Sequence, residues 1–256
     1  MASDKLPWEG FYTQAQLRRW LAAIPARFSC RSFSGPSDIA QAAALAYAAS
    51  RVSFKGIHIE ITRKNAESLV TPVPFFPKFS GVREYAAIYA NPDVPLARLL
   101  CGIAGEALNL EAVGLGLQGC WMMGNYRRGA VPPSANMAEK LMGVIVLGQP
   151  APDAGKGPRS RRPLASFCQD DPARWPHWAY AAAEAMRAAP SAGNRQPWKL
   201  DFAGRTLRYS GAMDSIDSGI ALLHLECAAH MHPRRWRTGA GGAGYNRVAD
   251  VPEDAV

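Results

Sequence analysis

The chain has 256 residues, of which 48% are hydrophobic, and this composition excludes a disordered or fibrous protein. Its 29 lysines and arginines outnumber its 21 acidic residues, and the formal net charge of +8 favours anionic partners. The basic residues lie in scattered clusters, which fits discrete phosphate sites as well as a nucleic-acid surface. Five isolated cysteines without metal-ligand spacing indicate neither a disulfide framework nor a metal site. Because no apolar signal segment or membrane-length run occurs, we expect a cytoplasmic protein without a membrane partner.

Apolar periodicity predicts a mixture of helices and strands along the chain. Runs with helical spacing predict helices over residues 8–24, 37–49, 96–115 and 178–189. Alternating or continuous apolar runs predict strands over residues 56–61, 82–89, 141–148 and 198–202. Residues 65–81 are rich in proline and phenylalanine, and we expect a packed surface loop there, with a cover over a ligand pocket as the alternative. The basic, glycine-rich residues 231–256 are predicted to form a flexible tail.

An extended segment near the N-terminus carries two arginines on either side of a serine. Side chains alternate along such a segment, so Arg27, Ser29 and Arg31 can converge on one side of it. Guanidinium groups and a hydroxyl are suitable ligands for a phosphate. A surface pattern of the same composition also arises by chance, and this alternative stays open from the residues alone.

Residues 190–198, Pro-Ser-Ala-Gly-Asn-Arg-Gln-Pro-Trp, join a predicted helix to a predicted strand. Pro190 ends the helix, and Ser191, Asn194 and Gln196 offer hydrogen-bond donors and acceptors. A plain turn does not need this set, which suits a flat polar heterocycle with hydrogen-bonding groups on its edge. An ordinary capped loop is the alternative interpretation.

These two motifs together resemble those of FMN-dependent nitroreductase-family proteins. In that family a Pro-Ser-x-x-Asn-x-Gln-Pro-Trp loop comes from one subunit and contacts the flavin held by the other. The family's Arg-x-Ser-x-Arg-x-Phe opening contacts the phosphate and ribityl of FMN. The resemblance therefore implies that Arg27, Ser29, Arg31, Pro190, Ser191, Asn194 and Gln196 bind FMN.

Two further segments are similar to the same family. Residues 114–124 resemble Gly-Leu-Gly-x-x-x-Cys-Trp-x-x-Gly, which implies that the backbone N–H groups of Met122, Met123 and Gly124 lie near the reactive edge of the flavin. Residues 159–164 resemble a basic-x-Arg-x-Pro-Leu segment, which implies that Arg159 and Arg161 hold the FMN phosphate. Cys120 is expected to be a buried residue at a helix end rather than a nucleophile.

The second half of the sequence repeats the first in degraded form. Residues 46–50 align with 186–190, residues 57–60 with 197–200, and residues 100–104 with 217–221. The first copy carries the phosphate arginines and the Gly-Cys-Trp segment, whereas the second carries the nine-residue loop. Internal repetition of this length indicates fusion of two copies. We therefore expect an α+β, nitroreductase-like α-β-α sandwich with two copies of the core motif in one chain.

The predicted boundaries are residues 1–168 for the first half and 169–256 for the second, together forming one compact unit. The resemblance implies a branch of the family in which a homodimer has become one polypeptide, with one flavin site between the halves. We expect a monomer with this internal pseudo-dimer, or a weak homodimer.

The resemblance implies an FMN-dependent oxidoreductase that takes electrons from NAD(P)H and passes them to a nitroaromatic, quinone or similar small-molecule acceptor by a ping-pong mechanism. FMN supplies the chemistry, so no catalytic side chain and no metal ligand are assigned. Two alternatives stay open. One is a different flavin reaction on the same fold, such as reductive dehalogenation or flavin fragmentation. The other is a protein that binds flavin or nucleic acid without turnover, although we expect no nucleic-acid partner.

Overall fold

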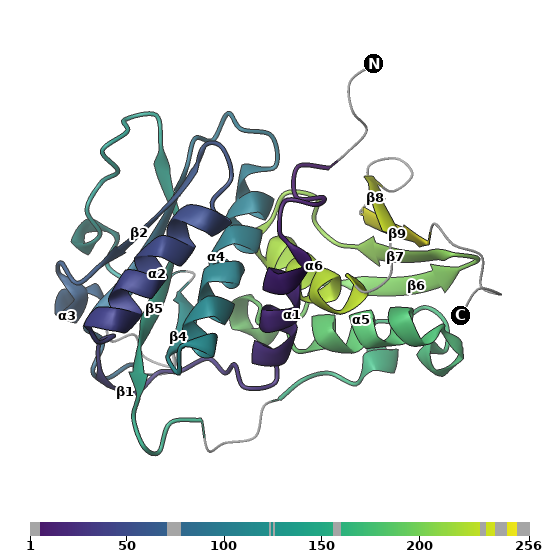
Figure 1. Ribbon diagram of the computed structural model, residues 1–256, viewed down its shortest axis with the longest axis horizontal. Coiled ribbons are helices and arrows are strands. Elements are labelled where there is room, and N and C mark those ends of the chain that lie inside the picture. Colours follow the sequence, from purple (N-terminus) through teal and green to yellow (C-terminus); the bar gives the residue numbers. More distant parts are fainter. Residues whose placement is uncertain are drawn as a thin grey trace.

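The computed structural model describes residues 6–70, 78–122, 124, 126–155, 160–230, 234–238 and 245–249. They form an α+β structure, as predicted, with two antiparallel sheets that flank a central group of helices (Figure 1). The helices are α1 (Gln14–Ala23), α2 (Ile39–Val52), α3 (Ala66–Leu69), α4 (Ala97–Gly114), α5 (His177–Arg187) and α6 (Ile216–Ala229). Short 3-10 turns are η1 (Arg128–Ala130), η2 (Leu164–Ser166), η3 (Pro172–Arg174) and η4 (Ala192–Asn194).

The first sheet contains β1 (Phe33–Gly35), β2 (Ile57–Thr62), β3 (Glu84–Ala90), β4 (Gln118–Met122) and β5 (Lys140–Pro150). The second contains β6 (Lys199–Ala203), β7 (Thr206–Ser210), β8 (Arg234–Thr238) and β9 (Tyr245–Ala249). The order β2-β3-β5-β4 in the first sheet matches the order β6-β7-β9-β8 in the second, and β1 is added at the end of β5. In each half a helix precedes two strands, and a second helix precedes the other two. The same arrangement of elements therefore occurs twice along the chain.

The helix starts follow from local capping groups. Thr13 caps α1, and its side chain and that of Gln16 form a reciprocal capping box. The predicted start at residue 8 is therefore wrong, because residues 7–12 form turns before this cap. Asp38 and Gln41 form the same kind of box at the start of α2, close to the predicted start. The N-terminus of α4 is capped from the other half of the chain, since Leu99 N–H donates to Asp214 Oδ1 at 2.9 Å.

The two long helices α4 and α6 touch through glycines. A Cβ atom on Gly102 would lie 2.2 Å from the carbonyl oxygen of Ile216, and one on Gly219 would lie 2.1 Å from that of Leu99. Each of these carbonyl groups precedes the glycine of its own helix by three residues, so the contact is reciprocal. Only residues without a side chain allow the two backbones to come this close.

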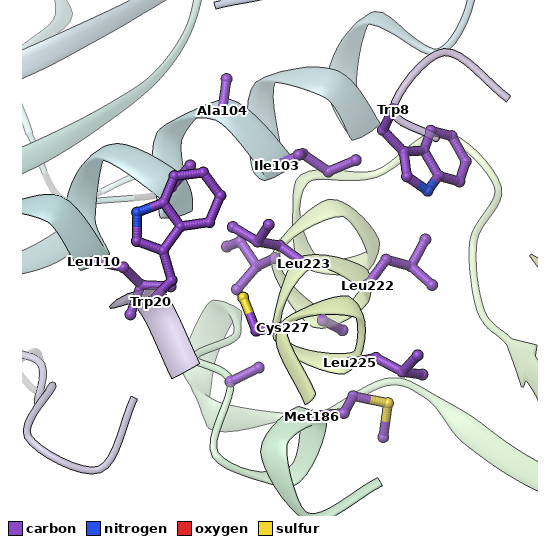
Figure 2. Close-up of a cluster of buried hydrophobic side chains, with 14 of the residues drawn as sticks. Trp8, Trp20, Ile103, Ala104, Leu110, Met186, Leu222, Leu223, Leu225 and Cys227 are labelled. Carbon is purple, nitrogen blue, oxygen red and sulfur yellow. The ribbon is translucent and has the colours of Figure 1, made fainter. Parts of the chain in front are cut away.

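The main hydrophobic core surrounds these two helices and draws on both halves of the chain. Figure 2 shows Leu223 and Cys227 of α6 facing Trp20 of α1, with Ile103 on the neighbouring α4 and Met186 of α5 at the other side of α6. Burying large apolar side chains contributes about 1.5–3 kcal/mol each. The two halves therefore share one core.

The C-terminal part of the described chain corrects the sequence analysis. Residues 231–256 were expected to form a flexible tail, but β8 and β9 complete the second sheet. Tyr245 is buried, packs edge-on against Trp8 with ring centroids 5.0 Å apart, and donates to the carbonyl oxygen of Met213 at 2.7 Å. Three of the five residues of β8 are arginines, which hides the strand from a search for apolar periodicity.

The proline-rich excursion is only partly described. It contains the short helix α3, and residues 71–77 lie outside the described residues, so the choice between a surface loop and a pocket cover stays open. Among the helices that the structure describes, none has the length and hydropathy needed to cross a membrane.

Candidate functional site

The arginine-serine segment lies beside the Gly-Cys-Trp segment. Cys30 N–H donates to the carbonyl oxygen of Gly119 at 3.1 Å, next to an isolated parallel bridge between Ser29 and Gly119. The Gln118 side chain extends the contact, since its Oε1 accepts from Phe28 N–H at 3.1 Å. Two predicted cofactor segments that are about ninety residues apart in sequence are therefore neighbours in the fold.

Cys120 lies between these segments. It belongs to strand β4, where it pairs with Val146, so the predicted position at a helix end is wrong. Burial raises the pKa of the Cys120 thiol to about 11, although the charges of Arg31 and Arg27 and a hydrogen bond with Ser29 act to lower it. Cys120 is therefore a protonated thiol near neutral pH, and the arginine-serine motif lies close to it.

One backbone carbonyl joins the two halves of the predicted site. Arg27 Nη2 donates to the carbonyl oxygen of Ala188 at 3.1 Å, and Arg161 Nη2 donates to the same oxygen at 3.2 Å. Ala188 follows α5 and directly precedes the nine-residue loop. Arg27 is buried, with 3% of its surface exposed, whereas Arg161 is half-buried. Two of the arginines predicted to bind phosphate thus meet at the start of the loop.

The loop itself is held against residues 160–162. Asn194 Oδ1 accepts from Arg161 Nη1 at 3.1 Å, and Asn194 Nδ2 donates to the carbonyl oxygen of Ser160 at 3.1 Å. The buried Gln196 accepts at Oε1 from Arg162 N–H at 3.1 Å. The two carboxamides that the sequence analysis selected are therefore in contact with the basic segment that it also selected.

The backbone of the loop is unusual. Gly193, Asn194 and Gln196 have positive φ angles of 59°, 55° and 50°. Positive φ is uncommon for residues other than glycine, and such residues gather at functional sites. Ser191 Oγ accepts from Gln196 N–H at 2.8 Å, and this bond closes the loop.

Asp217 in the first turn of α6 holds the loop from the other side. Its Oδ1 accepts from Ala192 N–H at 3.0 Å. Burial raises the pKa of Asp217, and the hydrogen bond from Ala192 and the charge of Arg195 act against this shift. A half-buried carboxylate therefore supports the loop that is predicted to contact the flavin.

The remaining predicted residues are placed as follows. Met122 is buried at the end of β4, Gly124 is exposed just beyond that strand, and Arg31 is exposed. Pro190 is buried after α5. Met123 and Arg159 lie outside the described residues. The structure thus brings Arg27, Ser29, Arg161, Ser191, Asn194 and Gln196 into one connected region, while their roles toward a cofactor stay predictions.

The sequence analysis missed a buried polar cluster behind this region, formed by Glu106 and Asn109 of α4, His224 of α6 and the indole N–H of Trp121. A signal was present, because Glu106 and His224 each directly follow an apolar stretch of a helix, residues 99–105 and 219–223. Charged residues are rarely buried without a partner, so such positions indicate paired groups. Among the described residues, no group of three or more histidine, cysteine or acidic side chains is arranged to hold a metal ion.

Comparison with known proteins places this geometry in context. Residues 20–229 match the family described as "Putative TM nitroreductase". The crystal structure of a "putative nitroreductase" from Thermotoga maritima MSB8 is similar, with a TM-score of 0.65, 25% sequence identity, and 91% of this chain and 94% of that chain covered. No curated protein matches the sequence.

Two more solved structures are similar over part of the chain. A nitroreductase with bound FMN from Bacteroides fragilis NCTC 9343 has a TM-score of 0.42 and 15% identity, and covers 56% of this chain and 94% of its own. A "putative NADH dehydrogenase/NAD(P)H nitroreductase" from Parabacteroides distasonis ATCC 8503 has a TM-score of 0.46 and 18% identity, and covers 60% of this chain and 96% of its own.

Proposed function

Because the chain belongs to the family described as "Putative TM nitroreductase", we propose that it is an FMN-dependent oxidoreductase. It passes electrons from NAD(P)H through FMN to a nitroaromatic, quinone or similar acceptor. The observation that carries this proposal is the meeting of Arg27 and Arg161 at the carbonyl oxygen of Ala188, where the nine-residue loop begins. Each of these motifs by itself resembles a motif of FMN-binding proteins, and in the fold the motifs are neighbours.

The chemistry of the donor set fits FMN. Guanidinium groups at Arg27, Arg31 and Arg161 suit a phosphate, and the Ser29 hydroxyl adds a donor. The carboxamides of Asn194 and Gln196 match a heterocycle whose edge both donates and accepts hydrogen bonds. These groups come from segments that the fold brings together, so the residues present are suitable for the cofactor.

FMN, when bound, supplies the two-electron chemistry, and the protein supplies binding, orientation and electrostatics. In this proposal Arg31 and Arg161 would neutralise the phosphate, and backbone N–H groups of the Gly-Cys-Trp segment would hold the reactive part of the ring. The exposed carboxamide of Asn194 would orient the ring through its polar edge, and the buried Gln196 would hold the loop in place. The buried thiol of Cys120 offers no thiolate nucleophile near neutral pH, because burial raises its pKa to about 11.

We also infer that one FMN site forms per chain, between two halves that correspond to the subunits of a dimer. Three features support this inference. The order of strands is the same in both sheets, and α4 and α6 meet in a reciprocal glycine contact of the kind that a two-fold interface produces. The arginine-serine and Gly-Cys-Trp motifs lie before residue 168, whereas the nine-residue loop lies after it. A monomer with this internal symmetry completes its site without a second chain.

The absorption spectrum of the purified protein tests the cofactor first. We expect a flavin absorption band at about 450 nm and release of FMN rather than FAD on denaturation. A colourless protein that also fails to bind added FMN would overturn the assignment. Oxidation of NADH and NADPH with nitrofurazone or menadione as acceptor then tests turnover, and a flavin-bound protein without such activity would favour a different flavin reaction or a binding role.

Substitutions test the residues. A charge-assisted hydrogen bond to a buried group contributes about 1.5–3 kcal/mol, so we expect Arg31→Ala to weaken FMN binding about ten- to a hundredfold. We expect Asn194→Ala to weaken it less, because a neutral bond contributes about 0.5–1.5 kcal/mol. Arg128→Ala, at another exposed arginine, is the control in the same titration of apoprotein with FMN. Equal affinity in all three variants would show that the site does not lie between the halves.

A further inference from the structure

Glu106 of α4 is the centre of a buried polar cluster whose members come from separate parts of the chain. The side chains of Glu106 and of His224 in α6 are both fully buried, and Glu106 Oε1 lies 2.9 Å from His224 Nε2 and 3.6 Å from Arg27 Nε. At the other carboxylate oxygen, Trp121 Nε1 donates to Oε2 at 2.7 Å and Asn109 Nδ2 donates at 3.2 Å. One carboxylate therefore interacts with four different side chains.

The partners of this cluster determine where its protons lie. His224 Nδ1 is 3.1 Å from the carbonyl oxygen of Ala185, and because that oxygen can only accept, Nδ1 carries a proton. Burial raises the pKa of Glu106, but the hydrogen bond with His224 and the charge of Arg27 prevail and hold it below its ordinary value. Glu106 is therefore a carboxylate, held by the side chains around it.

Three of the four partners of Glu106 lead to different predicted FMN segments. Arg27 belongs to the arginine-serine motif, and Trp121 belongs to the Gly-Cys-Trp segment in β4. His224 donates to Ala185 in the last turn of α5, the helix that leads into the nine-residue loop. Arg27 reaches the same place through the carbonyl oxygen of Ala188.

Burying the Glu106 carboxylate is unfavourable unless its partners offset the loss of water. Its burial is favourable only while the opposing cations and donors remain, and removing one member leaves an uncompensated buried charge. The same holds for Arg27, which is also buried. Movement of any one of the three segments would therefore break a buried hydrogen bond or ion pair of this cluster, in a medium where such interactions are strong.

We propose that Glu106, together with His224, is a positioning residue that holds the three FMN-binding segments in a fixed arrangement. This inference rests on the proposed function and adds to it a residue pair that has no resemblance to a cofactor-binding motif. Glu106 acts through Arg27, Trp121 and His224, so its removal changes the fit of the site to FMN in addition to the stability of the fold.

The test compares Glu106→Gln with Glu84→Gln. Glu84 of β3 is a matched control, because it is also buried and paired with an arginine, Arg63, but contacts none of the three segments. Each purified variant is titrated with FMN, its thermal midpoint is measured, and the midpoint potential of its bound FMN is determined by reductive titration. We expect Glu106→Gln to weaken FMN binding about ten- to a hundredfold. We expect Glu84→Gln to bind FMN like the wild type even where its thermal midpoint falls equally.

The potential separates positioning from stability. The midpoint potential shifts when Glu106→Gln changes the affinity for oxidised FMN and for reduced FMN by different factors. A tenfold difference between these two factors shifts the potential by about 30 mV for a two-electron couple. We expect a shift for Glu106→Gln and none for Glu84→Gln. In the double variant with Arg27→Ala, the loss of affinity should be smaller than the sum of the single losses, because Glu106 acts partly through Arg27.

The outcomes distinguish this inference from the proposed function. If the wild type binds no FMN, the proposed function fails. If the wild type binds FMN and Glu106→Gln matches it in affinity and potential, only the positioning role fails. Should Glu106→Gln not fold, His224→Gln replaces it, since this variant keeps a donor toward Glu106 but loses the bond to Ala185. Wild-type affinity and potential in a folded His224→Gln would then overturn the inference, and weaker binding with a shifted potential would support it.

Discussion

The contact between α4 and α6 can be tested by giving one of its glycines a side chain. The Cβ atom of an alanine at position 102 would lie 2.2 Å from the carbonyl oxygen of Ile216, which is part of a buried helix backbone and cannot rotate away. Overpacking a core costs about 1–3 kcal/mol, and we expect the upper end because the obstructing atom is backbone. Alanine favours the helix over glycine by about 1 kcal/mol. The net loss for Gly102→Ala is therefore about 2 kcal/mol.

Gly114→Ala is the matched control in the same helix, because a Cβ atom there would meet nothing within 4 Å. In a chain of this length 1 kcal/mol corresponds to about 2–4 °C, so Gly102→Ala should lower the thermal midpoint by about 4–8 °C. Gly114→Ala should leave it unchanged or raise it slightly. Thermal unfolding followed by circular dichroism measures both. A midpoint for Gly102→Ala at or above that of Gly114→Ala would refute the close backbone contact between the helices.

Three other predictions concern the site. At saturation one FMN should bind per chain, as measured from flavin absorbance and protein concentration. A ratio of two flavins per chain would contradict the division into complementary halves. Asp217→Ala removes the acceptor for Ala192 N–H and should weaken FMN binding by up to about tenfold, whereas Asp201→Ala, which removes only the ion pair with Arg208, should leave it unchanged in the same titration. Cys120 should resist iodoacetamide at pH 8 in the native protein and react after denaturation, since burial raises its pKa from 9.0 to about 11 in the folded state. Because the unfolded thiol ionises first as the pH rises, the fold should lose stability between these two values, and rapid native alkylation of Cys120 in a peptide mass map would contradict the burial argument.

The sequence was informative wherever the signal is local. Apolar periodicity predicted α4, α5 and the central strands, because each of these elements buries a face or its whole surface. The capping residue Asp38 placed the start of α2 within two residues. The nine-residue loop was recognised because its unusual backbone needs particular residue types, and the structure shows positive φ at Gly193, Asn194 and Gln196. Such requirements depend on only a few neighbouring residues.

Strands β8 and β9 show what local signals cannot supply. Their sequence is basic and close to a glycine-rich run, which has low strand propensity on its own. β9 becomes a strand because β7 offers an edge with unpaired backbone groups that it satisfies, and β8 then pairs with β9. The partner lies in a different part of the chain, so only the folded arrangement decides this.

The chain by itself determined its class, most of its helices and the four segments that resemble a flavin site. Tertiary structure alone decided that Arg27 and Arg161 share one carbonyl oxygen, and that Glu106 pairs with His224 more than one hundred residues away. The physical reason is that a buried charge is favourable only beside its partner. The identity of that partner depends on how two helices cross, and here the crossing depends on the absence of side chains at Gly102 and Gly219.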